Sequence, residues 1–69
     1  MSYGLIMLGP KLRRLRRRQK LSQEALARRL KVKREYVARI ELGAIKSPRI
    51  ETRRRLAKAL GVPITELLE

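Results

Sequence analysis

The sequence contains no cysteine, histidine, aspartate, asparagine, tryptophan or phenylalanine. Without cysteine, histidine and aspartate, the chain cannot build a Ser-His-Asp or Cys-His nucleophile, and it lacks the usual ligands of a zinc cluster. Its acidic residues are six glutamates scattered along the chain. We therefore expect no catalytic site, no metal site, no cofactor and no enzymatic activity.

The missing cysteines also exclude disulfides, so a domain of 69 residues must be held together by packing alone. That chemistry suits the reducing cytoplasm, where we expect the protein to reside, associated with the nucleoid. The longest apolar run, Leu5 to Leu8, ends at Gly9-Pro10. It is too short for a signal peptide or for a membrane span of about 20 residues.

Positive charge is what the sequence has in excess. It carries 19 lysines and arginines against 6 glutamates, for a net charge of +13. With 43% hydrophobic residues the chain can still fold, so the charge predicts a folded domain that binds a polyanion. Nucleic acid is the commonest polyanion in a cell.

The apolar residues recur at helical spacing and are separated by short turns, which predicts a compact all-α bundle of five helices. Ser22 is a good N-cap for the second helix, and Gly43 and Gly61 are expected to end the third and fourth. We expect the fourth helix to bury Ile50, Leu56, Ala57 and Leu60. The expected helices are residues 10–19, 22–30, 33–42, 50–60 and 64–68.

Residues 10–69 are thus expected to form the domain, preceded by an arm of residues 1–9. Because chain termini are commonly disordered, we favour a disordered tail for this arm. A strand exchanged between two subunits and a cover over an apolar patch are the alternatives.

The second and third helices are joined by a turn of only two or three residues. Such a connection makes the helices cross steeply, so that the second of them protrudes from the domain surface. A protruding helix with a polar outer face fits the major groove of B-DNA, which is about 12 Å wide.

The segment SQEALARRLKVKREYVARIELG resembles the helix-turn-helix of the phage-repressor (Cro/cI-type, XRE) family. The resemblance extends over about residues 8–68 and implies a repressor-like fold and a transcriptional regulator, a repressor by analogy, that binds double-stranded DNA. It is carried by Ser22-Gln23, Leu26-Ala27, Val32 and Ile40-Glu41-Leu42-Gly43.

The resemblance makes residues 33–42 the recognition helix. Arg34 and Arg39 have the chemistry for the task, since a guanidinium can bind guanine O6 and N7 together. Glu35 is expected either to accept from cytosine N4 or to pair with Arg39 one turn away. The expected base-contacting residues are Arg34, Glu35, Arg39, Lys33 and Ala38.

A second group of residues is expected at the DNA phosphates. Gln23 is expected to bind a phosphate at its helix N-terminus or to brace a recognition side chain. Tyr36 either donates its hydroxyl to a phosphate or covers its helix with its ring, and the run Arg53–Arg55 is expected to be a solvated face. The expected phosphate contacts are Gln23, Tyr36, Lys46, Arg49 and Arg13.

Arg16 and Glu41 fall where the resemblance implies a partly buried ion pair between the first helix and the recognition helix. We expect a structural role for both residues, because removing one partner of such a pair leaves an uncompensated buried charge. The alternative for Arg16 is one more phosphate-facing cation of the first helix.

Four residues depart from the family pattern. Lys31 replaces a glycine and is expected to be strained in a left-handed conformation. Lys33 replaces a capping serine or threonine. Leu42 replaces a polar residue, and Arg53 replaces a core leucine, with its stem expected to pack while its head reaches water.

One recognition helix reads only a few base pairs, so tight binding predicts a homodimer on two half-sites. The expected interface consists of Val62, Ile64, Leu67 and Leu68. An antitoxin, whose toxin partner the sequence does not reveal, and a restriction-modification controller would look nearly identical. A basic protein that binds RNA or the ribosome is the alternative from another class, although the chain has few aromatic residues on which bases could stack. A membrane-bound amphipathic helix is disfavoured, because the apolar residues are spread over several short helices.

Overall fold

Four α-helices and one 3-10 turn make up residues 8–68, the part of the chain that the computed structural model describes. The elements are α1 (Leu8–Arg18), α2 (Gln23–Leu30), α3 (Arg34–Leu42), α4 (Ile50–Leu60) and η2 (Ile64–Leu67). No strand occurs in this part of the chain. The arm was expected to comprise residues 1–9, and residues 1–7 lie outside the described part of the chain.

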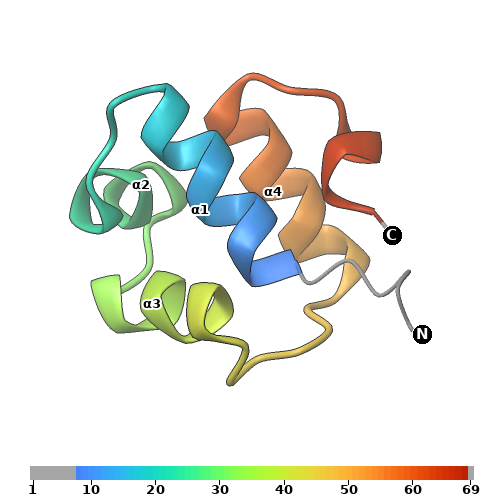
Figure 1. The fold of residues 1–69 in the computed structure, drawn as a ribbon, viewed down its shortest axis with the longest axis horizontal. Coiled ribbons are helices and arrows are strands. Elements are labelled where there is room, and N and C mark those ends of the chain that lie inside the picture. Colours follow the sequence, from blue (N-terminus) through green and yellow to red (C-terminus); the bar gives the residue numbers. More distant parts are fainter. Residues whose placement is uncertain (1–7, 69) are drawn as a thin grey trace.

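The helices are arranged around α1, which lies between α2 and α3 on one side and α4 with the C-terminal turn on the other (Figure 1). α1 packs against α3 and η2, and α2 packs against α3 and α4. One apolar core joins them. Its completely buried members are Leu12, Leu26, Val37, Ile40, Leu56, Leu60 and Leu67.

The helix boundaries follow from local chemistry. The Ser22 hydroxyl accepts a hydrogen bond from the Ala25 amide, which caps α2 as its sequence predicts. Gly43 and Gly61 end α3 and α4 in the left-handed conformation. Lys31 ends α2 in that same conformation, with φ of 60°, and Lys33 provides no side-chain cap for α3, as expected of both residues.

Two predicted elements, the first and the last helix, differ from the structure. α1 begins at Leu8 rather than Pro10, so Leu8 and Gly9 belong to the bundle instead of the arm. The expected fifth helix is a single 3-10 turn of four residues, whose Glu66 amide bonds to the Pro63 carbonyl. Four residues are too few for a ladder of α-helical hydrogen bonds.

Two residues of α4 are also placed differently from the prediction. Ile50 is 48% exposed, because it starts the helix beyond the edge of the core. Arg53 is only 7% exposed and occupies the inward stripe together with Leu56, Ala57 and Leu60. Its head does not reach water, and the run of arginines is therefore not a uniformly solvated face.

Gly9 sets how closely α1 approaches α3. A Cβ atom at this position would lie 2.7 Å from the Ile40 carbonyl oxygen and closer still to that of Glu41. Since both obstacles are backbone atoms, no side-chain rotation could make room. The contact brings the start of α1 against the end of α3, where the polar network described below is built.

Candidate nucleic-acid interface

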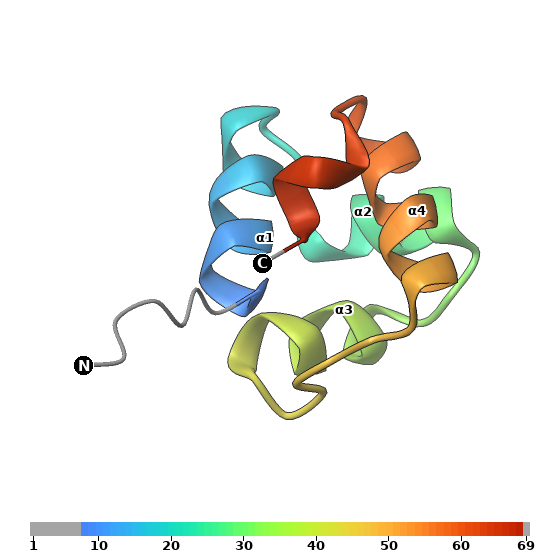
Figure 2. The ribbon, with the colours of Figure 1, turned by 90° about the vertical axis from the view of Figure 1, so that its right-hand side faces the viewer.

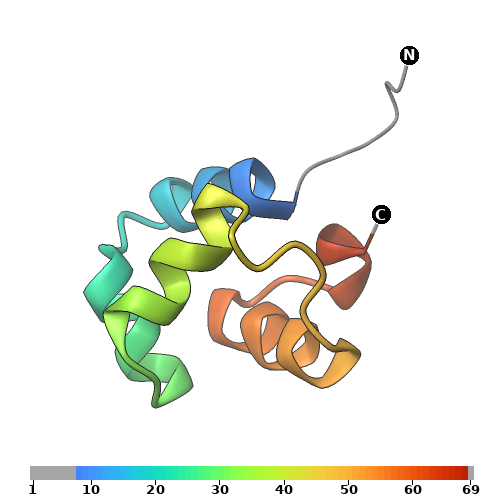
Figure 3. The same cartoon turned by 90° about the horizontal axis from the view of Figure 1, so that it is seen from below.

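α3 lies on the outside of the bundle. In Figure 3, the view from below, it crosses in front of the other elements, and in Figure 2 it forms the lower edge of the molecule. Its inner side carries Val37, Ile40 and Glu41, all of them buried. The opposite side is exposed at four positions and half-buried at Ala38, and its exposed residues are Arg34, Glu35, Arg39 and Leu42.

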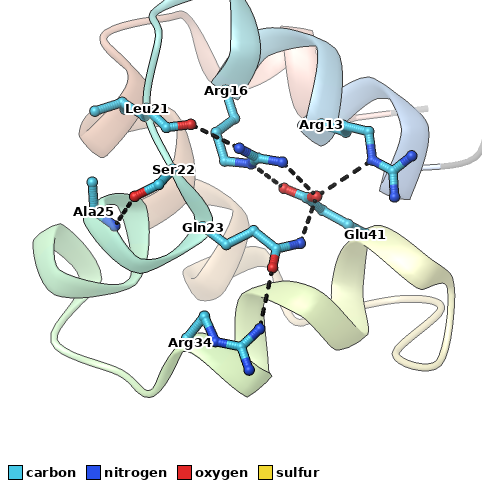
Figure 4. A network of polar contacts seen from close by, with 8 residues as sticks. All are labelled: Arg13, Arg16, Leu21, Ser22, Gln23, Ala25, Arg34 and Glu41. Carbon is cyan, nitrogen blue, oxygen red and sulfur yellow. Dashed lines mark hydrogen bonds and ion pairs between the residues drawn. The ribbon is translucent and has the colours of Figure 1, made fainter.

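The buried Glu41 carboxylate connects α3 to α1 (Figure 4). Arg16 donates to it in a two-pronged contact, from Nε to Oε2 at 2.6 Å and from Nη2 to Oε1 at 3.1 Å. The Nη1 atom of Arg16 donates to the Leu21 carbonyl at 2.7 Å, and Arg13 Nε lies 3.6 Å from Glu41 Oε1. Arg16 and Glu41 thus form the pair that the resemblance implies.

The pKa of Glu41 reflects two opposing effects. Burial raises the pKa of this carboxyl, but hydrogen bonds from Arg16 and Gln23, together with the charge of Arg16, lower it by more. The net pKa is below the usual value of 4.5. The carboxylate therefore stays ionised at neutral pH, as an acceptor only.

An acceptor-only carboxylate determines which way the Gln23 amide points. Gln23 Nε2 donates to Glu41 Oε1 at 3.0 Å, which leaves Gln23 Oε1 facing the start of α3. There it accepts from Arg34 Nη1 at 3.4 Å. The opposite amide orientation would place two oxygens together at Glu41 and two donors together at Arg34. The series Glu41, Gln23, Arg34 therefore runs from the core to the outer face of α3 (Figure 4).

The hold on Arg34 is loose enough to be exchanged for another partner. Its hydrogen bond to Gln23 is at the long end of the range. The remaining neighbour is Glu35, whose Oε2 lies 3.9 Å from Arg34 Nη2, and both side chains are more than half exposed. Such an exposed ion pair contributes little. Glu35 thus pairs with Arg34. The sequence interpretation that paired Glu35 with Arg39 is wrong.

The other cations expected at a phosphate backbone are distributed around α3. Lys33 precedes it and is exposed, and Lys46 and Arg49 are exposed in the loop that follows it. Tyr36 is half-buried against the core, whereas Arg13 is engaged with Glu41. Within residues 8–68 no group of three potential metal-ligating side chains exists.

A sequence model of the helix-turn-helix family matches residues 12–67, which include every element except the start of α1. The chain belongs to the helix-turn-helix family. α2 is the first helix of the motif, residues 31–33 are its turn, and α3 is its second helix. No match was found among curated proteins.

Solved structures support the helix-turn-helix assignment. The restriction-modification controller protein C.AhdI from Aeromonas hydrophila superposes with a TM-score of 0.81 and 36% identity over 88% of this chain and 87% of that chain. The hypothetical transcription factor NHTF from Neisseria gives 0.82 and 32% identity over 90% and 70%. The clp gene regulator ClgR from C. glutamicum gives 0.79 and 27% identity over 87% and 77%. The helix-turn-helix protein described here is a DNA-binding transcriptional regulator.

The structure also changes the expectations for the helix-turn-helix domain's C-terminal end. Leu67 is 1% exposed and fills the core. The sequence placed it in the dimer interface, but in the structure it is not available to a partner subunit. Val62 and Ile64 are half-buried against the core, and Leu68 is exposed.

The described helices include none with the length and hydropathy needed to cross a membrane.

Sequence reasoning missed two contacts of this helix-turn-helix domain. Arg13 was assigned to a phosphate, yet its guanidinium shares Glu41 with Arg16. The spacing of Arg13 and Arg16, three residues apart on one helix, was a signal that both could face one acid. The family pattern, with a core leucine in place of Arg53, indicated that its stem packs, but no sequence signal indicated that its head is also buried, because an arginine in a basic run is normally solvated.

Proposed function

We propose that this regulator reads base pairs in the major groove of double-stranded DNA with the outer face of α3. The observation that carries the proposal is the Glu41–Gln23–Arg34 series, which presents a guanidinium at the start of an exposed helix. An α-helix with its side chains is about 10–12 Å in diameter and therefore fits a groove about 12 Å wide.

Arg34 is suited to a guanine. Only one of its N–H donors is used by Gln23, so a pair of donors remains for guanine O6 and N7. The long hydrogen bond to Gln23 and the exposed contact with Glu35 leave the guanidinium free to turn to a base. Arg39 lies on the same side of α3, with Ala38 beside it, and Lys33 precedes both. Glu35 is placed to accept from cytosine N4 once Arg34 turns to a base.

The phosphate contacts proposed for this regulator flank α3. Lys46 and Arg49 are exposed after the helix. Tyr36 lies in its first turn, and Gln23 contacts its start through Arg34. Arg13 is assigned to Glu41 first and to phosphate second, since its side chain is still 43% exposed. These contacts set the register of the protein on DNA, whereas base contacts set its preference for sequence.

We also propose that the regulator binds as a homodimer through its C-terminal end. A two-fold dimer places two α3 helices in successive major grooves about 34 Å apart. The apolar side chains available for this contact are Val62, Ile64 and Leu68. Leu68→Glu should lower the apparent mass in sedimentation, whereas Leu42→Glu on α3 should leave it unchanged.

The experiment that tests the proposed function begins with selection of duplexes from a random library by the wild-type chain. Arg34→Ala and Arg39→Ala should each cost about 1–3 kcal/mol on the selected duplex and little on a scrambled one. Arg54→Ala is the matched control, because Arg54 is an exposed arginine on α4. It should weaken both duplexes equally.

Two results would reject the proposal. If no sequence is enriched, or if the Arg34 and Arg39 variants weaken both duplexes as Arg54→Ala does, then α3 does not read bases. Stronger binding to structured RNA than to any duplex would favour the RNA-binding alternative.

Control of a restriction-modification system is a second candidate for the regulated target. The similarity to the Aeromonas hydrophila controller favours it, at 36% identity over most of both chains. The test is whether the selected duplex sequence occurs upstream of a restriction endonuclease or methyltransferase gene in the source genome. An occurrence beside a toxin gene would favour an antitoxin instead.

A further inference from the structure

Arg53 is a buried cation that is held by neutral groups. It lies in the inward stripe of α4, where Leu56 and Leu60 follow on the same side. Its Nη1 donates to the Leu67 carbonyl at 2.9 Å, its Nε to the Pro48 carbonyl at 3.2 Å, and its Nη2 to the Ser47 hydroxyl at 3.4 Å. Within residues 8–68 it forms no ion pair with a carboxylate.

These three acceptors belong to two segments that are otherwise separate. Ser47 and Pro48 lie in the loop between α3 and α4, and Leu67 is the last residue of η2. In Figure 2 the loop passes below α4 while the C-terminal turn lies beside it. Arg53 therefore ties the loop to α4 and to the C-terminal turn at once.

Two other features also restrain the loop, since Pro48 is buried and the Arg49 carbonyl accepts from the Arg53 amide at 3.1 Å. The Arg53 side chain matters most for the backbone between them and α3. No backbone-to-backbone hydrogen bond within the described residues involves residues 46–48. Lys46 and Arg49 stand immediately before and after the two residues that Arg53 holds, and both are exposed. The position of Lys46 thus depends on the Arg53 side chain, and that of Arg49 depends on it together with the backbone hydrogen bond to α4.

We propose that Arg53 is a positioning residue that orders the loop so that Lys46 and Arg49 meet DNA phosphates without further loss of freedom. The inference rests on the proposed function. Ordering a segment of backbone costs conformational entropy, and a loop ordered during folding does not incur that cost again on binding. The planar guanidinium can reach three acceptors in different directions. A leucine would fill the space but would tie neither segment.

The test uses Arg53→Lys, which keeps the charge but cannot span the three acceptors. Its matched control is Arg54→Lys, the same exchange at the exposed neighbouring position. Backbone order parameters of residues 46–49 in the free protein are measured by NMR relaxation. We expect values of about 0.85 in the wild type and in Arg54→Lys, and values near 0.6 or below in Arg53→Lys.

The second readout is the salt dependence of binding to a random-sequence 20-base-pair duplex. Affinity falls as salt rises, and each lost phosphate contact lowers the magnitude of the slope of log affinity against log salt by about 0.9. Arg53→Lys should lower the slope by about one to two for each subunit, and Arg54→Lys should not. Because Arg53→Lys keeps the net charge, such a change cannot come from the number of cations. Arg53→Met should reproduce both effects.

Each other outcome overturns the inference. Unchanged order parameters show that the loop is ordered without Arg53. Changed order parameters with an unchanged slope show that loop order does not serve DNA contacts. Loss of the cooperative thermal transition in both the Lys and Met variants shows that Arg53 supports the whole fold. If the wild type binds no DNA, the proposed function fails, while the order parameters still decide whether Arg53 orders the loop.

Discussion

Removing either partner of the Arg16–Glu41 pair should destabilise this domain more than any surface change. The Arg16 side chain is 9% exposed and the Glu41 side chain is completely buried. Arg16→Ala leaves a buried carboxylate, and Glu41→Ala leaves a buried guanidinium. Neither remaining charge can reach water without moving α1 away from α3, whose contact at Gly9 is backbone to backbone.

The expected cost is about 3–5 kcal/mol for each single variant. A chain of 69 residues is expected to have a total stability of roughly 3–10 kcal/mol, so the loss is a large fraction of it. At about 4–8 °C per kcal/mol, the melting temperature should fall by at least about 12 °C.

The two variants should not be equal. After Arg16→Ala, Glu41 keeps the hydrogen bond from Gln23 and the nearby charge of Arg13. After Glu41→Ala, Arg16 keeps only the Leu21 carbonyl. We therefore expect Glu41→Ala to cost more than Arg16→Ala.

Thermal and urea unfolding followed by circular dichroism provide the measurement. Arg17→Ala is the control, because Arg17 is an exposed arginine adjacent to Arg16 on α1. It should change stability by less than about 0.5 kcal/mol. The double variant Arg16→Met with Glu41→Leu should recover most of the loss, since apolar residues of similar volume can replace a buried pair. Single variants as stable as Arg17→Ala would refute the reasoning.

Three further predictions concern stability. Lys31→Gly should raise it by about 1 kcal/mol in urea unfolding, because the left-handed backbone at φ of 60° strains a residue with a Cβ. A lower stability would show that the unfolded chain's added freedom outweighs the strain. Gly9→Ala should lower the melting temperature sharply, because the new Cβ meets the Ile40 and Glu41 carbonyls; an unchanged value would mean that α1 can shift freely. The pKa of Glu41 is lower in the folded chain than its usual 4.5, so its contribution is complete above that pH and is lost as pH falls through the lower value. Glu41→Gln should flatten this acid limb of the stability profile, and an unchanged limb would exclude Glu41 as its source.

Local patterns predicted most of the helical architecture of this chain. Ser22 and Gly43 act within one turn of their own positions, so their effect on helix ends could be inferred without tertiary information. The strain at Lys31 was implied by the family resemblance, which has a glycine at this position. The 3-10 turn and the start of α1 were not predicted, because there the helical tendency of a few residues competes with packing against the bundle.

The interface was only partly predictable. The family resemblance identified Arg16 and Glu41 as a pair and placed Arg34 and Arg39 on the groove-facing side of the recognition helix. The sequence could not show that Gln23 bridges Glu41 and Arg34, nor that Glu35 pairs with Arg34. Those contacts depend on which donors and acceptors face one another once α1, α2 and α3 are assembled.

The sequence by itself determined that the chain is basic, helical and built around a short helix-turn-helix, because charge, periodicity and capping act over a few neighbouring residues. Only the tertiary structure decided which of the many arginines are available to a polyanion. Arg13 looks like its neighbours in the sequence, yet it shares a buried carboxylate with Arg16, and the head of Arg53 holds a loop instead of reaching water. The difference arises because the energy of a charge depends on the groups that surround it after folding, and those groups come from distant parts of the chain.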